Sequence, residues 1–200
     1  MRKLLVTTFV SLDGVMQAPG GPEEDREGGF AYGGWIAPHW DDALGAVLDE
    51  TLARPLDLLL GRRTYEIFSG YWPHHADEPV GKPLNDATKY VVSGSHPSLE
   101  WGPAELIENP ASEIPELKRS DGPELQVHGS ANLVQTLMRH GLVDEFQLFV
   151  FPVTIGSGKR LFGDGTVPAG FKLAWSSVSS TGVTVGRYEL VGELETGSVA

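Results

Sequence analysis

The sequence predicts an α/β domain in which a mixed, mostly parallel sheet carries helices on both faces and an antiparallel hairpin at its C-terminal edge. Short apolar runs alternate with segments of helical period along most of the chain, which is typical of β-α-β units. The last two strand-like runs, residues 172–180 and 183–191, are separated only by Thr181 and Gly182, which favours a hairpin.

One folding unit is expected over residues 1–192, followed by a flexible tail at residues 193–200. The sequence contains no internal repeat and no linker long enough to divide it. Its hydrophobic content of 40% is sufficient for one core in a chain of 200 residues.

The N-terminal part of the chain predicts a strand, a long loop and a helix. Residues 3–9 are apolar and form the first strand, and residues 16–39, rich in Gly, Pro and acidic residues, form an irregular loop. Asp41 or Asp42 caps the helix that follows. The apolar face of this helix, close to a period of 3.6 residues, consists of Leu44, Val47, Leu48 and Leu52.

The rest of the chain continues the alternation. Residues 56–60 are continuously apolar, as in strands buried on both faces, and a helix follows through Tyr65 and Phe68. Gly141 ends the last predicted helix. Further strands are predicted at residues 89–93, 105–107, 125–127 and 145–153, and further helices at residues 113–119 and 130–140.

Composition excludes several classes of function. The formal charge of −12 disfavours a nucleic-acid partner, because phosphate backbones require a basic surface. The chain has no cysteine, which excludes disulfides and thiolate chemistry. No apolar stretch approaches the length of a membrane span, and the first apolar run is too short for a signal peptide, so a cytoplasmic protein without a membrane partner is expected.

The clearest candidate for an anion site is the corner between residues 125–127 and the helix after them. Gly129 permits a tight turn or a close approach to a ligand, and Ser130 is a good helix N-cap. The free N–H groups of the first helical turn would then face a phosphate. The same pattern also occurs as plain α/β architecture, so this corner needs a second site to support it.

The second candidate corner follows residues 56–60. Gly61 again stands at the end of a strand, and Thr64 places a hydroxyl at the start of a helix. Arg62 and Arg63 supply bidentate donors for phosphate, although exposed arginines are also common as solvated surface charges. Two such corners in one small domain indicate a ligand with more than one phosphate, such as a dinucleotide.

Five short motifs in this order resemble those of the dihydrofolate reductase-like fold, and the resemblance covers nearly the whole chain. Within this fold, the chain is most similar to the reductase domain of riboflavin biosynthesis, the C-terminal domain of the bacterial bifunctional deaminase-reductase, and its stand-alone relatives. The resemblance implies a three-layer fold. The motifs are Ser11-Leu-Asp-Gly14, Gly61-Arg-Arg-Thr-Tyr-Glu66, His128-Gly-Ser130, Gly141-Leu-Val-Asp-Glu145 and Pro152-Val-Thr-Ile-Gly156 with Leu161-Phe162.

The resemblance further implies a reductase that uses NADPH and delivers a hydride to a pyrimidine- or pterin-like heterocycle, as 5-amino-6-(5-phosphoribosylamino)uracil reductase does. A homodimer is expected. The cofactor-binding residues that the resemblance implies are Gly61, Arg62, Arg63, Thr64, Ser93, Gly94, Gly129, Ser130, Ala131 and Asn132.

The substrate side is predicted from two features. Asp13, in a turn after the first strand, is the candidate catalytic carboxylate, although Asp before Gly is also a common turn pair. Phe30, Tyr32 and Trp35 lie among glycines and are candidates for an aromatic lid over a flat substrate, or anchors of a long loop. His74 and His75 lack a third ligand, so no metal site is predicted.

A non-catalytic module that binds a nucleotide, flavin or pterin is the alternative function. Dihydrofolate reductases carry a carboxylate on their first helix, and the matching position here is Gly45, which has no side chain. The two phosphate corners favour the enzyme, whereas this missing carboxylate favours the binding module.

Overall fold

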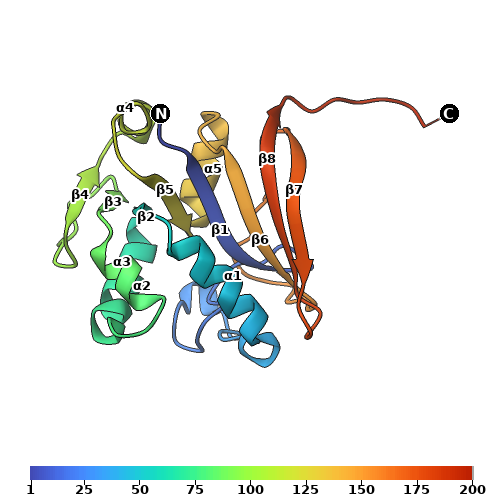
Figure 1. The fold of residues 1–200 in the computed structure, drawn as a ribbon, viewed down its shortest axis with the longest axis horizontal. Helices are drawn as coiled ribbons and strands as arrows, with labels where there is room; N and C mark the ends of the chain where they lie inside the picture. Colours follow the sequence, from blue (N-terminus) through green and yellow to red (C-terminus); the bar gives the residue numbers. More distant parts are fainter. Residues whose placement is uncertain (200) are drawn as a thin grey trace.

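The computed structural model describes residues 1–199 and contains one eight-stranded sheet in the order β4-β3-β2-β5-β1-β6-β8-β7 (Figure 1). All neighbouring strands pair in parallel except β6 with β8 and β8 with β7. The predicted mixed sheet with an antiparallel C-terminal hairpin is therefore confirmed. The strands are β1 (Leu4–Ser11), β2 (Leu56–Gly61), β3 (Lys89–Val92), β4 (Ala104–Ile107), β5 (Glu124–His128), β6 (Glu145–Phe151), β7 (Gly170–Val178) and β8 (Thr184–Gly192).

Helices cover both faces of the sheet, as a three-layer fold requires (Figure 1). None of the helices in residues 1–199 is long and apolar enough to cross a membrane. The helices are α1 (Asp42–Leu52), α2 (Arg62–Tyr71), α3 (Gly81–Asp86), α4 (Pro110–Arg119) and α5 (Ala131–Arg139), with short 3-10 helices η1 (Glu27–Gly29), η2 (Ala37–His39) and η3 (Trp72–His75).

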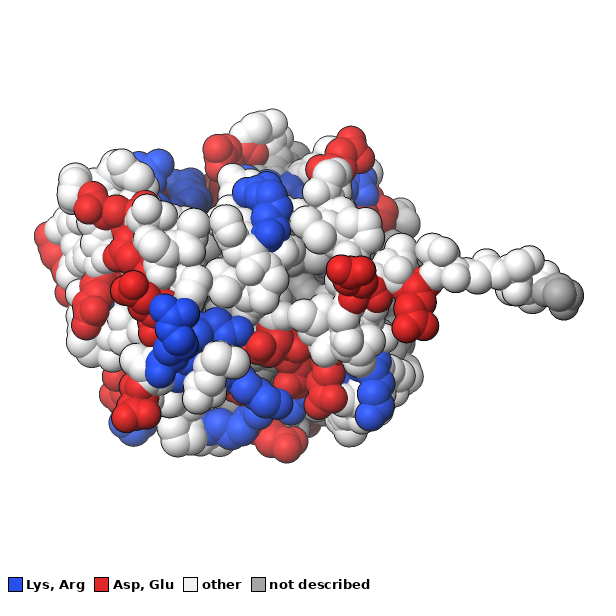
Figure 2. Space-filling model, turned by 90° about the horizontal axis from the view of Figure 1, so that it is seen from above, with Lys and Arg blue, Asp and Glu red and all other residues white. Residues whose placement is uncertain are grey.

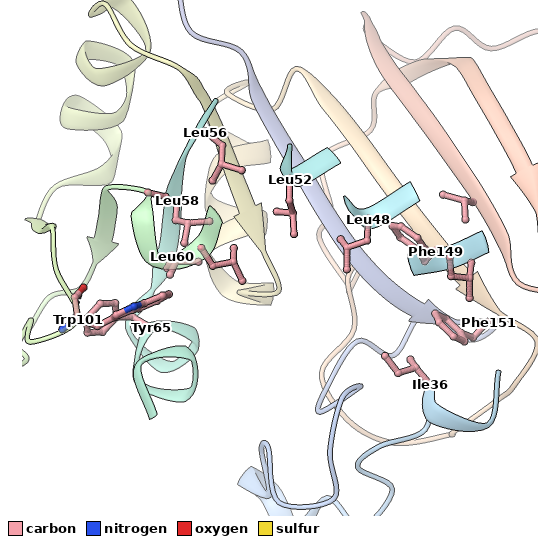
Figure 3. Close-up of a cluster of buried hydrophobic side chains, with 14 of the residues drawn as sticks. Ile36, Leu48, Leu52, Leu56, Leu58, Leu60, Tyr65, Trp101, Phe149 and Phe151 are labelled. Carbon is pink, nitrogen blue, oxygen red and sulfur yellow. Dashed lines mark hydrogen bonds between the residues drawn. The ribbon is translucent and has the colours of Figure 1, made fainter. Parts of the chain in front are cut away.

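Each face of the sheet carries its own hydrophobic core. Successive side chains of a strand point to opposite faces, so Leu58 and Leu60 of β2 belong to one core and Leu59 belongs to the other. The first core joins α1, α2 and α3 to the sheet (Figure 3). The second core joins α4 and α5 to the opposite face. The continuously apolar β2 is thus buried on both faces, as its sequence predicts.

Asp41, rather than Asp42, is the cap of α1. Its Oδ1 accepts a hydrogen bond from the backbone N of Leu44 at 3.0 Å, and its Oδ2 accepts one from the Ser180 hydroxyl at 2.8 Å. This single carboxylate therefore starts α1 and also ties it to the turn before β8.

A further difference from the predicted elements lies between β2 and β3. The Pro- and Gly-rich stretch after α2 contains η3 and the short helix α3, which the sequence pattern did not reveal. Residues 193–199 are exposed and extend away from the domain (Figure 1).

Candidate functional site

A cleft of about 1390 Å³ opens where β1, β2 and β5 end. Carboxyl ends of parallel strands are where ligands bind in α/β sheets, because helix N-termini and loops converge there. The walls come from α1, α2, the N-terminal part of α5 and the loop at residues 16–27. The cleft exceeds the usual range of about 300–1,000 Å³ for small-ligand pockets, so it has room for more than one small molecule.

The two predicted anion corners meet in this cleft. The backbone N of Gly61 donates to the Ser130 hydroxyl at 3.0 Å, and that hydroxyl donates to Thr64 Oγ1 at 2.8 Å. Gly129 has φ +66°, and an added Cβ there would stand 3.7 Å from the Thr64 side chain. The starts of α2 and α5 are thereby fixed side by side.

Ser130 does not cap α5, contrary to the sequence prediction. Its backbone is left-handed, with φ 59° and ψ 52°, whereas a capping residue has extended backbone. Within residues 1–199, no side chain caps the first turn of α5 or of α2, so their leading N–H groups remain free for a ligand. The two helix N-termini together form a seat for a group with several negative charges.

Arg62 and Arg63 both line the cleft. Their side chains are 54% and 55% exposed, and each lies 3.8 Å from a carboxylate oxygen of Glu66. Exposed pairs at this distance contribute little, so both guanidinium groups are available to a phosphate. Ala131 and Asn132, the other predicted residues of the second corner, also line the cleft.

Ser93 and Gly94 do not line the cleft, although Val92 just before them does. The Ser93 hydroxyl instead accepts from the backbone N of Ser95 at 3.1 Å within its own turn. The turn follows β3, which pairs with β2, so it borders the Arg62 corner without entering the cleft.

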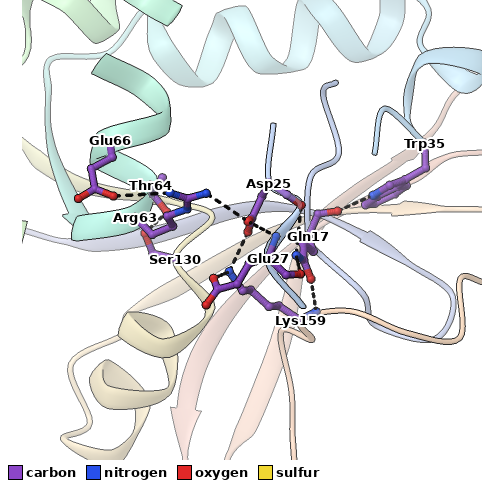
Figure 4. Close-up of polar contacts among 9 residues, drawn as sticks. All are labelled: Gln17, Asp25, Glu27, Trp35, Arg63, Thr64, Glu66, Ser130 and Lys159. Atoms are coloured by element: carbon purple, nitrogen blue, oxygen red, sulfur yellow. Dashed lines mark hydrogen bonds and ion pairs between the residues drawn. The ribbon is translucent and has the colours of Figure 1, made fainter. Parts of the chain in front are cut away.

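The loop at residues 16–27 is called the acidic loop below. A network of charged side chains holds it across the cleft (Figure 4). Lys159 Nζ donates to Asp25 at 2.7 Å and to Glu27 at 2.5 Å, and Arg63 lies 3.8 Å from Asp25. Burial acts to raise the pKa of Asp25, but the Lys159 ammonium and the Glu27 N–H outweigh it and lower that pKa. Gln17 adds hydrogen bonds to the carbonyl oxygens of Asp25 and Glu27.

Asp13 lies outside the cleft lining. Its carboxylate accepts hydrogen bonds from the Ser11 hydroxyl and from the backbone N–H groups of Ile155 and Gly156, which hold its pKa far below the usual range. Arg160 adds a hydrogen bond to its backbone carbonyl. A carboxylate held ionised in this way joins the loops after β1 and β6, and it is a poor source of protons.

The three predicted lid aromatics do not line the cleft. Phe30 is buried against Val15 and Ala18, and the Trp35 indole donates to the Gln17 carbonyl at 2.8 Å. Tyr32 is 58% exposed and packs edge-on against Phe30. These aromatics therefore anchor the long loop.

The cleft also has an apolar part, which was not recognised in the sequence because its side chains follow the same helical period as core residues. Leu48 and Leu52 are the residues of α1 that reach the cleft, and Phe68 and Trp72 face it from α2 and η3. Gly45 contributes nothing to the lining, and within residues 1–199 no carboxylate of α1 reaches it. Residues 1–199 also contain no cluster of three or more His, Asp or Glu that could hold a metal ion.

Comparison with known proteins identifies a relative by sequence and further ones by structure. The uncharacterized protein YyaP of Bacillus subtilis is 27% identical over 187 residues, which cover 91% of this chain and 92% of YyaP. A solved structure from Shewanella sp. PV-4, described as a candidate riboflavin biosynthesis protein, has a TM-score of 0.68 and 21% identity, covering 94% of this chain and 98% of that one.

Dihydrofolate reductase from Enterococcus faecalis, solved with NADP(H), has a TM-score of 0.60 and 13% identity, and the match covers 94% of this chain and 96% of that one. The dihydrofolate reductase-like fold is therefore confirmed. A family model described as "RibD C-terminal domain" matches residues 2–185. Because this match spans nearly the whole sequence, the chain belongs to the RibD C-terminal domain family.

Proposed function

We propose that this protein is an NADPH-dependent reductase that transfers a hydride to a small pyrimidine- or pterin-like heterocycle. The observation that carries the proposal is the division of the cleft. Helix N-termini with Arg62 and Arg63 supply its charged part, whereas Leu48, Leu52 and Phe68 supply an apolar part. Family membership supports a reductase, and the likeness to a dihydrofolate reductase solved with NADP(H) supports this cofactor.

The donor set of the two corners suits the phosphates of a dinucleotide. Arg62 and Arg63 offer guanidinium forks, and the free N–H groups at the starts of α2 and α5 offer further donors. Gly129 leaves the turn beside Thr64 free of a side chain. When bound, NADPH supplies the hydride, and these residues hold its phosphates.

The chain's own contribution to the reaction is orientation and exclusion of water. Leu48, Leu52 and Phe68 form an apolar wall that holds a flat ring in one plane. We assign no proton transfer to Asp13, because its pKa is lowered and its side chain does not line the cleft. The proton that accompanies the hydride then comes from water.

Titration with NADPH and NADH tests the proposal. We expect micromolar binding of NADPH and weaker binding of NADH, read from nicotinamide fluorescence. In Arg62→Ala, the NADPH dissociation constant should rise about ten- to hundredfold, because one charge-assisted contact is worth about 1.5–3 kcal/mol, whereas NADH binding should change little. Arg119→Ala, at the exposed end of α4, is the matched control. If the protein binds neither nucleotide, the reductase proposal is wrong.

A non-catalytic binding module is the second candidate, and the lining of α1 favours it. Only Leu48 and Leu52 reach the cleft from this helix, so among the described residues α1 contributes no carboxylate to the lining. NADPH oxidation assayed with pteridines, quinazolines and aminouracils separates the two functions. Nucleotide binding without turnover of any of these compounds would favour the module.

We also propose a homodimer, formed through the C-terminal hairpin. Leu173, Trp175 and Val178 of β7 are exposed large apolar side chains, as are Leu190 and Val191 of β8. Because β7 is the edge strand of the sheet, a second copy of the chain would cover both an unpaired edge and an apolar patch.

A further inference from the structure

The Arg63 guanidinium lies between two carboxylates (Figure 4). Its Nη1 is 3.8 Å from Glu66 Oε2, and its Nη2 is 3.8 Å from Asp25 Oδ1. Arg62, its neighbour in the first turn of α2, has only Glu66 within ion-pair distance among residues 1–199. The two arginines at the start of α2 are therefore not equivalent, although they are adjacent in the sequence.

The two carboxylates beside Arg63 differ in how strongly water screens their charges. The Glu66 side chain is 41% exposed, whereas the Asp25 side chain is 8% exposed. Because its pKa is lowered, Asp25 is ionised at neutral pH. Water weakens the field of an exposed carboxylate, and a buried carboxylate is screened much less. Asp25 is therefore the stronger of the two partners of Arg63.

Four charged side chains balance one another at the acidic loop. Lys159 Nζ donates to Asp25 at 2.7 Å and to Glu27 at 2.5 Å, so one ammonium serves two carboxylates. The guanidinium of Arg63 is the second positive charge of this set. If a ligand phosphate takes Arg63, the two carboxylates are left with one ammonium, and an uncompensated negative charge stands beside the phosphate.

Hydrogen bonds of Gln17 hold the acidic loop in place without using its charges. Gln17 Nε2 donates to the carbonyl oxygens of Asp25 at 3.2 Å and Glu27 at 3.0 Å. Its Oε1 accepts from the backbone N of Lys159 at 3.0 Å. The Gln17 side chain is buried, and its partners in these bonds are backbone atoms. Neutralising Asp25 therefore leaves the loop anchored at the cleft.

We infer that Asp25 competes with a bound phosphate for Arg63 and thereby limits the affinity of the cleft for NADPH. Arg62 is the freer phosphate ligand of the two arginines. NADP⁺ carries the same phosphates, so Asp25 weakens the binding of oxidised and reduced cofactor alike. The inference rests on the proposed reductase function, because the phosphate that Asp25 opposes is that of the proposed cofactor.

Asp25→Asn tests this competition, because it removes the charge and keeps an oxygen that can accept from the Glu27 N–H, as Asp25 Oδ1 does at 3.1 Å. We expect the NADPH dissociation constant, measured by calorimetry, to fall about tenfold, since a like charge beside the phosphate is removed. Asp121→Asn, at an exposed position outside the cleft lining, changes the net charge by the same amount. This control should leave the dissociation constant unchanged.

The two arginines provide matched backgrounds for the same substitution. Arg62→Ala and Arg63→Ala each remove one guanidinium from the start of α2, but of the two only Arg63 pairs with Asp25. Asp25→Asn should therefore tighten NADPH binding about tenfold in Arg62→Ala and less than about twofold in Arg63→Ala. Equal gains in the two backgrounds would mean that Asp25 does not act through Arg63, and would overturn the inference.

A purely structural role for Asp25 predicts a change of the opposite sign. Asp25→Asn deprives Lys159 of one of its two carboxylates, so the melting temperature of the free protein should fall. A loosened loop would weaken NADPH binding, whereas competition predicts tighter binding by this less stable protein. If Asp25→Asn does not fold, Glu27→Gln replaces it, because Glu27 is 62% exposed and its loss leaves Lys159 to Asp25 alone. The dissociation constant should then fall by a smaller factor.

The outcomes distinguish this inference from the proposed function. If the wild type does not bind NADPH, the reductase proposal is wrong, and the inference is wrong with it. If the wild type binds NADPH but Asp25→Asn binds it no more tightly, the reductase proposal stands and the competition between Asp25 and the phosphate is refuted.

Discussion

The carboxylate of Asp13 joins two loops through hydrogen bonds. It accepts backbone hydrogen bonds from Ile155 and Gly156 in the loop after β6, while it belongs itself to the turn after β1. Both loops border the segment that carries Lys159, which holds the acidic loop in place. The position of the cleft's outer wall therefore depends on a side chain that does not line the cleft.

Asp13→Asn should destabilise the protein in a pH-dependent way. The folded-state pKa of Asp13 lies below its unfolded value near 3.9, so ionised Asp13 stabilises the fold fully above about pH 4 and progressively less as the pH falls below that. The free energies of unfolding of wild type and variant, measured with urea, should therefore differ most at pH 7 and converge toward pH 2.

Asp164→Asn is the control for this measurement, because Asp164 is an exposed carboxylate in the following loop. It should leave the free energy of unfolding nearly unchanged at every pH. If the free energies of unfolding of wild type and Asp13→Asn differ by the same amount from pH 7 to pH 2, the ionised carboxylate does not stabilise the contact between the two loops.

Ser130 illustrates what sequence reasoning misses at the residue scale. A Gly-Ser pair before an amphipathic run predicts an N-cap, and the helix does begin at the next residue. The left-handed backbone of Ser130 turns the hydroxyl instead toward Gly61 and Thr64. Local sequence thus predicted the position of the corner, but the hydrogen-bond partners, Gly61 and Thr64, lie 69 and 66 residues away in the sequence.

At the scale of elements, the loop before α1 depends on one close backbone approach. A Cβ added at Gly33 would lie 2.5 Å from the Gly21 carbonyl oxygen and 2.9 Å from Pro22 Cα. Gly21 and Pro22 line the cleft, whereas Gly33 does not. This loop therefore folds back on itself at a glycine and presents its acidic segment to Arg63.

Gly33→Ala should displace the cleft wall, although residue 33 itself does not line the cleft. Forcing a methyl group against backbone costs about 1–3 kcal/mol, so the free energy of unfolding should fall by that amount. The NADPH dissociation constant should rise as well. Gly163→Ala is the matched control, since an added Cβ there meets no heavy atom within 4 Å among residues 1–199. Equal effects of the two substitutions would contradict this account of the loop.

At the scale of the whole molecule, the sequence predicted the sheet and the positions of the two strand-helix corners that meet in the cleft, because strand-helix periodicity and Gly corners are local patterns. It did not predict the acidic loop network, because Asp25 and Lys159 are separated by 134 residues and neither stands in a motif. Two cleft-lining residues on neighbouring strands escaped for a similar reason. Thr7 and His128 are ordinary strand residues until the sheet pairs them.

The proposed dimer gives a prediction at this same scale. In light scattering after gel filtration, the wild type should have twice the 21.6 kDa mass of one chain. Trp175→Glu should give monomers, because a charge on β7 would be buried without a partner in the interface. Leu12→Glu, at an exposed position outside β7 and β8, should leave the mass unchanged. A monomeric wild type would refute the dimer.

The charge of this protein also affects how quickly an anion can reach its cleft. The chain carries a net charge of −12, and the acidic loop stands across the cleft, whereas the attraction of Arg62 and Arg63 acts only at short range. Basic and acidic side chains are interspersed on the face shown in Figure 2, so that face carries no broad basic surface. The screening length falls from about 30 Å at 0.01 M salt to about 8 Å at 0.15 M. Added salt should therefore accelerate the encounter with NADPH, the reverse of the electrostatic steering that most anion sites use.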